Sequence, residues 1–198
     1  MKKIIFALLI SIFSLPIIGT CNDATDPIDL DQYKMKASWH LKKYWYNKNN
    51  SKKLTKLKLT LNLSDSIQNQ PGISLENFEH VLRDNMHTHF EKAGLQLVDE
   101  NPDAVLSLNV VEMTQGDRQQ RILAGEFGLG SARVYIDGYL RDAENQLVVV
   151  AFKAHQSNTG NAGLRDITHD SGPTLVKEMS EKISRDLSKE LRRSMKIR

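Results

Sequence analysis

The only cysteine of the chain, Cys21, stands where its thiol could be acylated. Lys2 and Lys3 form a basic start, and residues 4–18 are apolar apart from two serines and one proline. A basic start, an apolar run and a small-residue end are typical of a secretory signal peptide. The run is shorter than the roughly 20 residues that a membrane-spanning helix needs. The pattern therefore predicts export, with residues 1–21 as the signal.

The residues around Cys21 predict that this signal is a lipoprotein signal. Such a signal ends at a cysteine that is diacylated and becomes the first residue of the mature chain, which is then tethered to a membrane by its acyl chains. The segment "IIGTC" resembles this motif in part, since Thr20 and Ile18 differ from the residues usually found there. Asn22 favours the outer membrane over the inner one. The alternative is ordinary signal-peptidase cleavage, which would leave the protein soluble in the periplasm or secreted.

Histidines could bind a metal, and three of the six lie in one segment with a helical pattern. A metal pair on a helix needs a spacing of three or four residues. His87 and His89 point about 200° apart around a helix axis, and His80 and His87 are two turns apart. We therefore expect surface histidines, and we predict neither a metal site nor a cofactor.

A glycine-rich loop holds Gly125, Gly128 and Gly130. Their order is G-x-x-G-x-G, and the loop precedes a predicted strand, so it does not form the phosphate-binding turn of a dinucleotide site, which opens a helix. It is either a tight turn or, as an alternative, a ligand-binding loop. No serine stands in a G-x-S-x-G elbow, and we predict no catalytic residue. An enzyme would need dispersed groups to converge in the fold, and the candidates are His155, His169 and Asp166 or Asp170.

A stretch rich in lysine and aromatic residues is the strongest binding candidate. Residues 32–64 contain nine lysines and no acid, together with both tryptophans, Trp39 and Trp45. Lysines attract anions, and aromatic rings suit a membrane interface or stack on a flat ligand. Nucleic acid is excluded by the predicted export, so an anionic lipid or an envelope protein is the expected partner. The alternative is that the rings pack on the domain and the lysines are solvated.

The elements that must position these residues follow from periodicity. Leucines alternate with polar residues over residues 56–63, as in a half-buried strand. A helix with an apolar stripe is expected from residue 74 to Gly94, which suits a helix end. A second amphipathic helix is expected over residues 174–193. Further strands are expected at residues 95–98, 104–113, 132–140 and 146–154, the last two joined by a hairpin turn.

This order of elements predicts an α+β fold, a two-layer sandwich with a mainly antiparallel sheet of about four to five strands packed against two helices. Residues 22–53 form a leader and the Lys/aromatic-rich segment, and residues 54–198 form a single domain. The formal net charge of +3 falls to +1 once the two lysines of the signal are removed, so the total charge does not indicate a partner.

The segments "NPDAVLSLNV" and "GEFGLGSARVYIDGYLRDAENQLVV", with the closing amphipathic helix, resemble the bacterial envelope family known as domain of unknown function 4410. The resemblance spans about residues 57–191. It implies an exported, often lipidated α/β protein and carries over no catalytic residue. The expected function is that of a cell-envelope protein, a lipoprotein with a non-enzymatic binding or structural role. A periplasmic enzyme and a secreted factor are the alternatives.

Overall fold

The computed structural model describes residues 28–38, 41–50, 52–64, 67, 75–114, 132–158 and 172–195. The elements are, in chain order, the 3-10 helix η1 (Leu30–Gln32), β1 (Lys43–Tyr46), β2 (Lys56–Leu63), α2 (Leu75–Lys92), β3 (Gln96–Leu97), β4 (Ala104–Thr114), β5 (Ala132–Asp142), β6 (Val148–Asn158) and α4 (Gly172–Ser194). Among these residues no helix is both long and apolar enough to span a membrane.

The described strands form one sheet in the order β1-β6-β5-β4-β2-β3. The neighbours from β1 to β4 are antiparallel, whereas β2 runs parallel to both β4 and β3. Helix α2 connects β2 to β3, as parallel neighbours require a crossover. The predicted α+β class is confirmed. The predicted number of four to five strands is too low, because residues 43–46 of the Lys/aromatic-rich segment add the edge strand β1.

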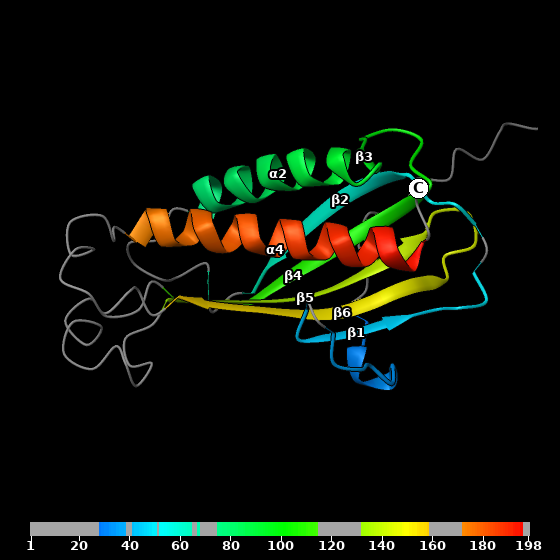
Figure 1. Ribbon diagram of the computed structural model, residues 1–198, viewed down its shortest axis with the longest axis horizontal. Helices are drawn as coiled ribbons and strands as arrows, with labels where there is room; N and C mark the ends of the chain where they lie inside the picture. Colours follow the sequence, from blue (N-terminus) through cyan, green and yellow to red (C-terminus); the bar gives the residue numbers. More distant parts are fainter. Residues whose placement is uncertain are drawn as a thin grey trace, which may run out of the picture.

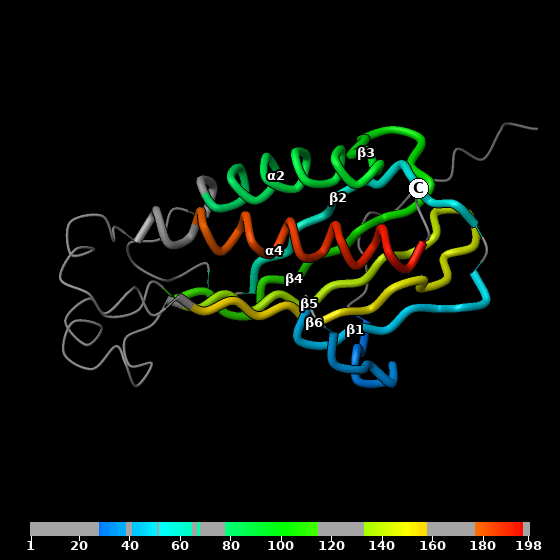
Figure 2. Tube along the Cα trace, in the orientation of Figure 1, coloured from blue at the N-terminus to red at the C-terminus, as the bar shows by residue number. Residues whose placement is uncertain are grey.

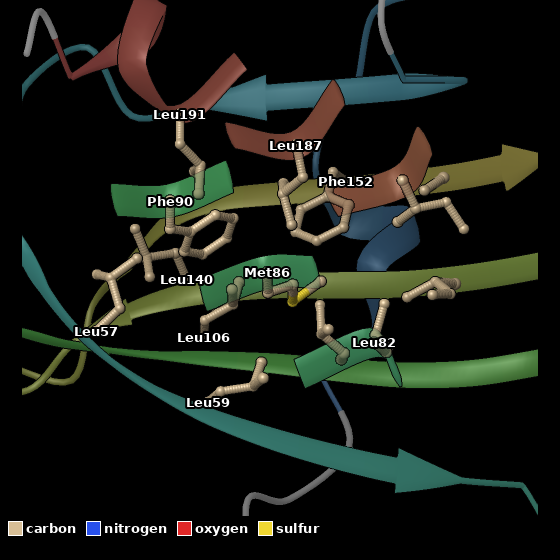
Figure 3. Close-up of a cluster of buried hydrophobic side chains, with 14 of the residues drawn as sticks. Leu57, Leu59, Leu82, Met86, Phe90, Leu106, Leu140, Phe152, Leu187 and Leu191 are labelled. Atoms are coloured by element: carbon tan, nitrogen blue, oxygen red, sulfur yellow. The ribbon is translucent and has the colours of Figure 1, made fainter. Parts of the chain in front are cut away.

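Both helices lie side by side on one face of the sheet, and the 28–36 segment lies on the other (Figure 1). The tube in Figure 2 shows α2 and α4 running along the sheet over most of its length. Alternate residues of β2 and β4 point to the helices and are buried, as the leucine pattern predicts. In Figure 3 the side chains of the sheet meet those of both helices in one core, which includes Leu57, Leu59, Leu82, Met86, Phe90, Leu106, Leu140, Phe152, Leu187 and Leu191.

One position in the sheet is restricted to glycine by its cross-strand neighbour. Gly138 on β5 pairs directly with Phe152 on β6. The ring of Phe152 lies over the glycine, so that a β-carbon added at residue 138 would meet its Cζ atom at 2.4 Å. Real β-carbons do not approach other atoms this closely. On the core side of the hairpin, the ring of Phe152 therefore occupies the space that a side chain at residue 138 would need.

The predicted β5–β6 hairpin is confirmed, and a buried carboxylate organises its turn. Asp142 is 2% exposed, and its Oδ1 atom accepts hydrogen bonds from the backbone N–H of Glu144 at 2.9 Å and of Asn145 at 3.4 Å. Its Oδ2 atom lies 3.0 Å from Nζ of Lys52. Lys52 also contacts the exposed Glu144 at 2.6 Å. One carboxylate thus ties the turn to the segment between β1 and β2.

Candidate functional site

The sheet presents a second, partly uncovered face on the side away from α2 and α4. We call this side the open face. It carries the side chains that alternate with the core positions, so it is built from polar, charged and aromatic residues. On the four central strands and β1 these are Lys58, Thr60, Asn62, Val105, Ser107, Asn109, Glu112, Arg133, Tyr135, Asp137, Tyr139, Arg141, Ala151, Lys153, His155, Lys43 and Trp45.

The 28–36 segment covers part of the open face. Leu30 of η1 is 8% exposed and forms a small apolar cluster with Tyr139 and Ala151. Trp45, a predicted ligand-binding residue, packs against this cluster, and its ring lies 4.8 Å from that of Tyr33 at 46°. Trp45 as a whole is half-buried. The ring of Trp45 therefore lies between the sheet and the 28–36 segment, and its role in ligand binding stays a prediction.

The other predicted site residues lie outside the described part of the chain. These are Cys21, Trp39, Gly125, Gly128 and Gly130. Among the residues of the possible enzyme site, only His155 is described, whereas Asp166, His169 and Asp170 are not.

A stacked aromatic pair forms the most distinctive group on the open face. Tyr135 on β5 and His155 on β6 are direct cross-strand partners, and their rings stack with centroids 4.0 Å apart and an angle of 16° between planes. Nζ of Lys42 lies 5.2 Å from the centre of the Tyr135 ring, in the range of a cation–π contact. Glu112 on β4 is the register partner of Tyr135 on its other side. Sequence reasoning missed this pair, because its residues are 20 positions apart.

Burial and nearby positive charge favour the neutral form of His155. Burial lowers the pKa of His155, and the positive charges of Lys42 and Arg133 lower it further, while Glu112 acts in the opposite direction. The buried Nε2 atom of His155 has no hydrogen-bond partner among the described residues. The neutral form of an imidazole suits stacking and hydrogen bonding rather than ionic attraction.

The pKa of His155 gives a direct check of this geometry. Lys42→Gln removes the positive charge that lowers the pKa of His155 most, so we expect this pKa to move up toward its ordinary value. The pKa is measured by NMR titration of the imidazole. Lys43→Gln, an exposed lysine next in the chain, is the matched control and should leave the titration of His155 unchanged. Equal effects of the two substitutions would contradict the arrangement of Lys42 over the stacked pair.

Next to the stacked pair, Lys153 joins the open face to the covering segment. Its Nζ atom lies 3.1 Å from Oδ1 of Asp31 and 3.8 Å from Oδ2 of Asp137. The hydrogen bond with Asp31 raises the pKa of Lys153. Burial raises the pKa of Asp137, although Lys153 opposes that shift. These contacts hold the 28–36 segment on the sheet at its polar edge.

The histidines of α2 lie apart from the open face. His80 and His87 are exposed and face acids one helical turn away, with Nδ1 of His80 2.9 Å from Asp84 and Nδ1 of His87 3.8 Å from Glu91. Within the described ranges, no three histidines, cysteines or acids are grouped as a metal would require. The open face itself presents stacked rings, hydrogen-bonding groups and charged groups.

Comparisons with known proteins give structural likeness at low sequence identity. No family model matches the chain, and no curated protein matches it. Solved structures similar to it include the PelC dodecamer from Paraburkholderia phytofirmans, with 11% identity over 72% of this chain and 92% of that chain and a TM-score of 0.42. The resemblance to domain of unknown function 4410 stays a prediction.

Two other similar structures come from bacteria. A protein from Xanthomonas campestris, of domain of unknown function 330, is 12% identical over 74% of this chain and 87% of that chain, with a TM-score of 0.46. A minor lipoprotein from Acinetobacter baumannii is 16% identical over 71% of this chain and 92% of that chain, with a TM-score of 0.39.

Proposed function

We propose that the protein is an exported envelope lipoprotein, anchored through Cys21, that uses the open face of its sheet to bind another envelope component. The observation that carries the proposal is the signal pattern that ends at the only cysteine of the chain. A single cysteine forms no internal disulfide, so acylation gives this thiol a use in an oxidising compartment.

The geometry supports the open face as the surface near the membrane. Ile28, which packs with the small apolar cluster on the open face, lies seven positions after Cys21. A chain of that length reaches at most roughly 25 Å. An acylated Cys21 therefore keeps Ile28, and the part of the open face that it contacts, within that distance of the bilayer surface. The helices lie on the opposite side of the sheet (Figure 1).

The composition of the open face supports binding. The stacked Tyr135–His155 pair offers a flat aromatic surface, and Lys42 adds positive charge at its side. Such a combination suits a partner with an exposed ring or apolar group beside an acidic group. An envelope protein or an anionic lipid headgroup has this chemistry, and delivery to the periplasmic side of the outer membrane would present both.

Fractionation of cells that express the full chain tests the proposal. We expect the wild-type protein in the outer-membrane fraction, resistant to a high-salt wash because salt screens ionic contacts and leaves acyl chains in place. Cys21→Ser should release essentially all of it into the soluble periplasm. Thr20→Gly, which brings the motif closer to a lipoprotein signal, is the control and should stay with the membrane. Wild-type protein in the periplasmic fraction or the culture medium would contradict the anchor.

A further inference from the structure

A hollow of about 630 Å³ lies between the segment that follows β1 and the last turn of α4. Its volume falls in the range that small-molecule sites occupy. The lining combines three lysines with a polar and an apolar wall, and it consists of Tyr46, Lys48, Asn50, Lys52, Lys53, Ser194 and Met195. This site is separate from the stacked pair on the open face.

Hydrogen bonds fix the loop that carries the lysines. The backbone N–H of Asn47 donates to the carbonyl of Val149 at 2.8 Å, which continues the pairing of β1 with β6. Oδ1 of Asn47 accepts from the N–H of Asn49 at 3.1 Å, and the hydroxyl of Tyr46 donates to the carbonyl of Asn50 at 3.2 Å. Asparagine side chains that bond nearby backbone groups stabilise turns of this kind. Residues 46–50 are therefore held in place by their own hydrogen bonds.

A further asparagine bond and an ion pair fix the exit of the loop. Oδ1 of Asn50 accepts from the N–H of Lys52 at 2.9 Å, and Nζ of Lys52 contacts Asp142 and Glu144. The hydrogen bonds that Nζ of Lys52 donates to these two acids raise the pKa of Lys52. Lys52 is thus committed to the hairpin turn, and the exposed Lys48 and Lys53 are the cations available to a ligand.

The charge of the hollow favours an anion. No acidic residue contributes to its described lining. The carboxyl end of a helix disfavours anions, but Arg192 and Arg193 stand in the last turn of α4 and offset its partial negative charge. Met195, 8% exposed, and the half-buried Tyr46 add an apolar wall, and Ser194 and Asn50 add polar groups.

We propose that this hollow binds a phosphate ester, with the phosphate between Lys48 and Lys53 and its organic part against Tyr46 and Met195. Lysine ammonium groups bind phosphates as point charges, and a doubly charged phosphate gains from two cations more than a carboxylate does. The hollow is larger than a phosphate group alone, which leaves room for the esterified part. The ester is either a soluble molecule or the headgroup of a membrane lipid, since both carry the same group.

Calorimetry with the protein as purified after export tests the site, in a nonionic detergent for the soluble probes and after removal of the detergent for the vesicles. The probes are inorganic phosphate, glycerol 3-phosphate, and vesicles of phosphatidylglycerol compared with phosphatidylcholine. We expect saturable binding of glycerol 3-phosphate that is tighter than that of inorganic phosphate. The double substitution Lys48→Gln and Lys53→Gln should raise the dissociation constant about tenfold or more.

The matched control is the double substitution Lys177→Gln and Lys182→Gln, which removes the same charge from the exposed first half of α4. It should change the dissociation constant by less than about twofold. Acetylation of Lys48 and Lys53, followed by mass spectrometry, should slow when glycerol 3-phosphate is bound. Preference for phosphatidylglycerol vesicles over the soluble ester would identify a lipid headgroup, and the reverse would identify a soluble ester. Absence of saturable binding, or equal losses in both double variants, would overturn the site.

Discussion

Gly138→Ala is expected to destabilise the domain by about 1–2 kcal/mol, although alanine is ordinarily more stabilising than glycine inside a strand. Propensity alone predicts the opposite sign, since replacing a strand glycine by alanine gains roughly 0.5–1 kcal/mol. Here the new β-carbon would meet the ring of Phe152 at 2.4 Å. Overpacking of a closed core costs about 1–3 kcal/mol, because side chains and backbone must shift. Urea denaturation followed by circular dichroism measures the change.

A second substitution separates the clash from a general weakness of the hairpin. Phe152→Leu shortens the side chain over Gly138 and alone should cost about 1–1.5 kcal/mol. In the double variant the alanine at position 138 fills the space that the ring leaves. The double variant should therefore be more stable than the sum of the two single changes predicts, by about 1 kcal/mol or more. Strict additivity would show that the two residues do not contact each other as described.

Asp142→Ala is expected to destabilise the domain by about 2–3 kcal/mol, because it removes the acceptor of two backbone N–H groups and the partner of Lys52. Glu144→Gln removes the other acid that contacts Lys52, but Glu144 is exposed, and its loss should cost less than about 0.5 kcal/mol. Each variant removes one negative charge that contacts Lys52. Similar losses in both would contradict the central place of Asp142 in the turn.

Low pH should destabilise the β5–β6 turn that Asp142 organises. Burial by itself would raise the pKa of Asp142, but the N–H groups of residues 144 and 145 and the ammonium group of Lys52 outweigh it, and the pKa lies below its ordinary value. A carboxyl with a lowered pKa stabilises the folded state above its unfolded pKa, and this contribution disappears as the pH falls through the lowered value. Asp142→Asn should therefore flatten the decline in the free energy of unfolding below about pH 4.

The main elements could be predicted because their side chains alternate or repeat clearly. The leucines of β2 and the apolar stripes of α2 and α4 give unambiguous periods, and the two-layer class follows from their order. Strand β1 was missed because "KYWY" is short and places an aromatic residue on both faces, with Tyr44 toward the core and Trp45 toward the open face. Alternation between polar and apolar residues is then lost.

The ends of β6 and the stacked pair depend on features that a single sequence hides. The strand continues past residue 154 because Gln156 is buried, and its Nε2 atom donates to Asp186 of α4 at 3.5 Å. A polar residue on the core face made the strand seem to end early. The pairing of Tyr135 with His155 depends on a register shift between Leu140 and Arg141, and no residue pattern in the sequence predicts this shift.

The lysine hollow, like the stacked pair, could be predicted only in part from the sequence. Its three lysines lie close together in the sequence, in the stretch that the lysine pattern predicts to attract anions. The apolar wall comes from Tyr46 and from Met195, which directly follows α4, about 150 residues further along the chain. Only the packing of α4 beside β6 brings the two parts together.

The intact mass of the mature protein purified from the envelope tests the anchoring of this protein most directly. We predict a chain that begins at Cys21 and carries two or more acyl chains, and the added mass should vanish in Cys21→Ser. An unmodified mature chain that begins at another residue would contradict the anchor and the proximity of the open face to the membrane.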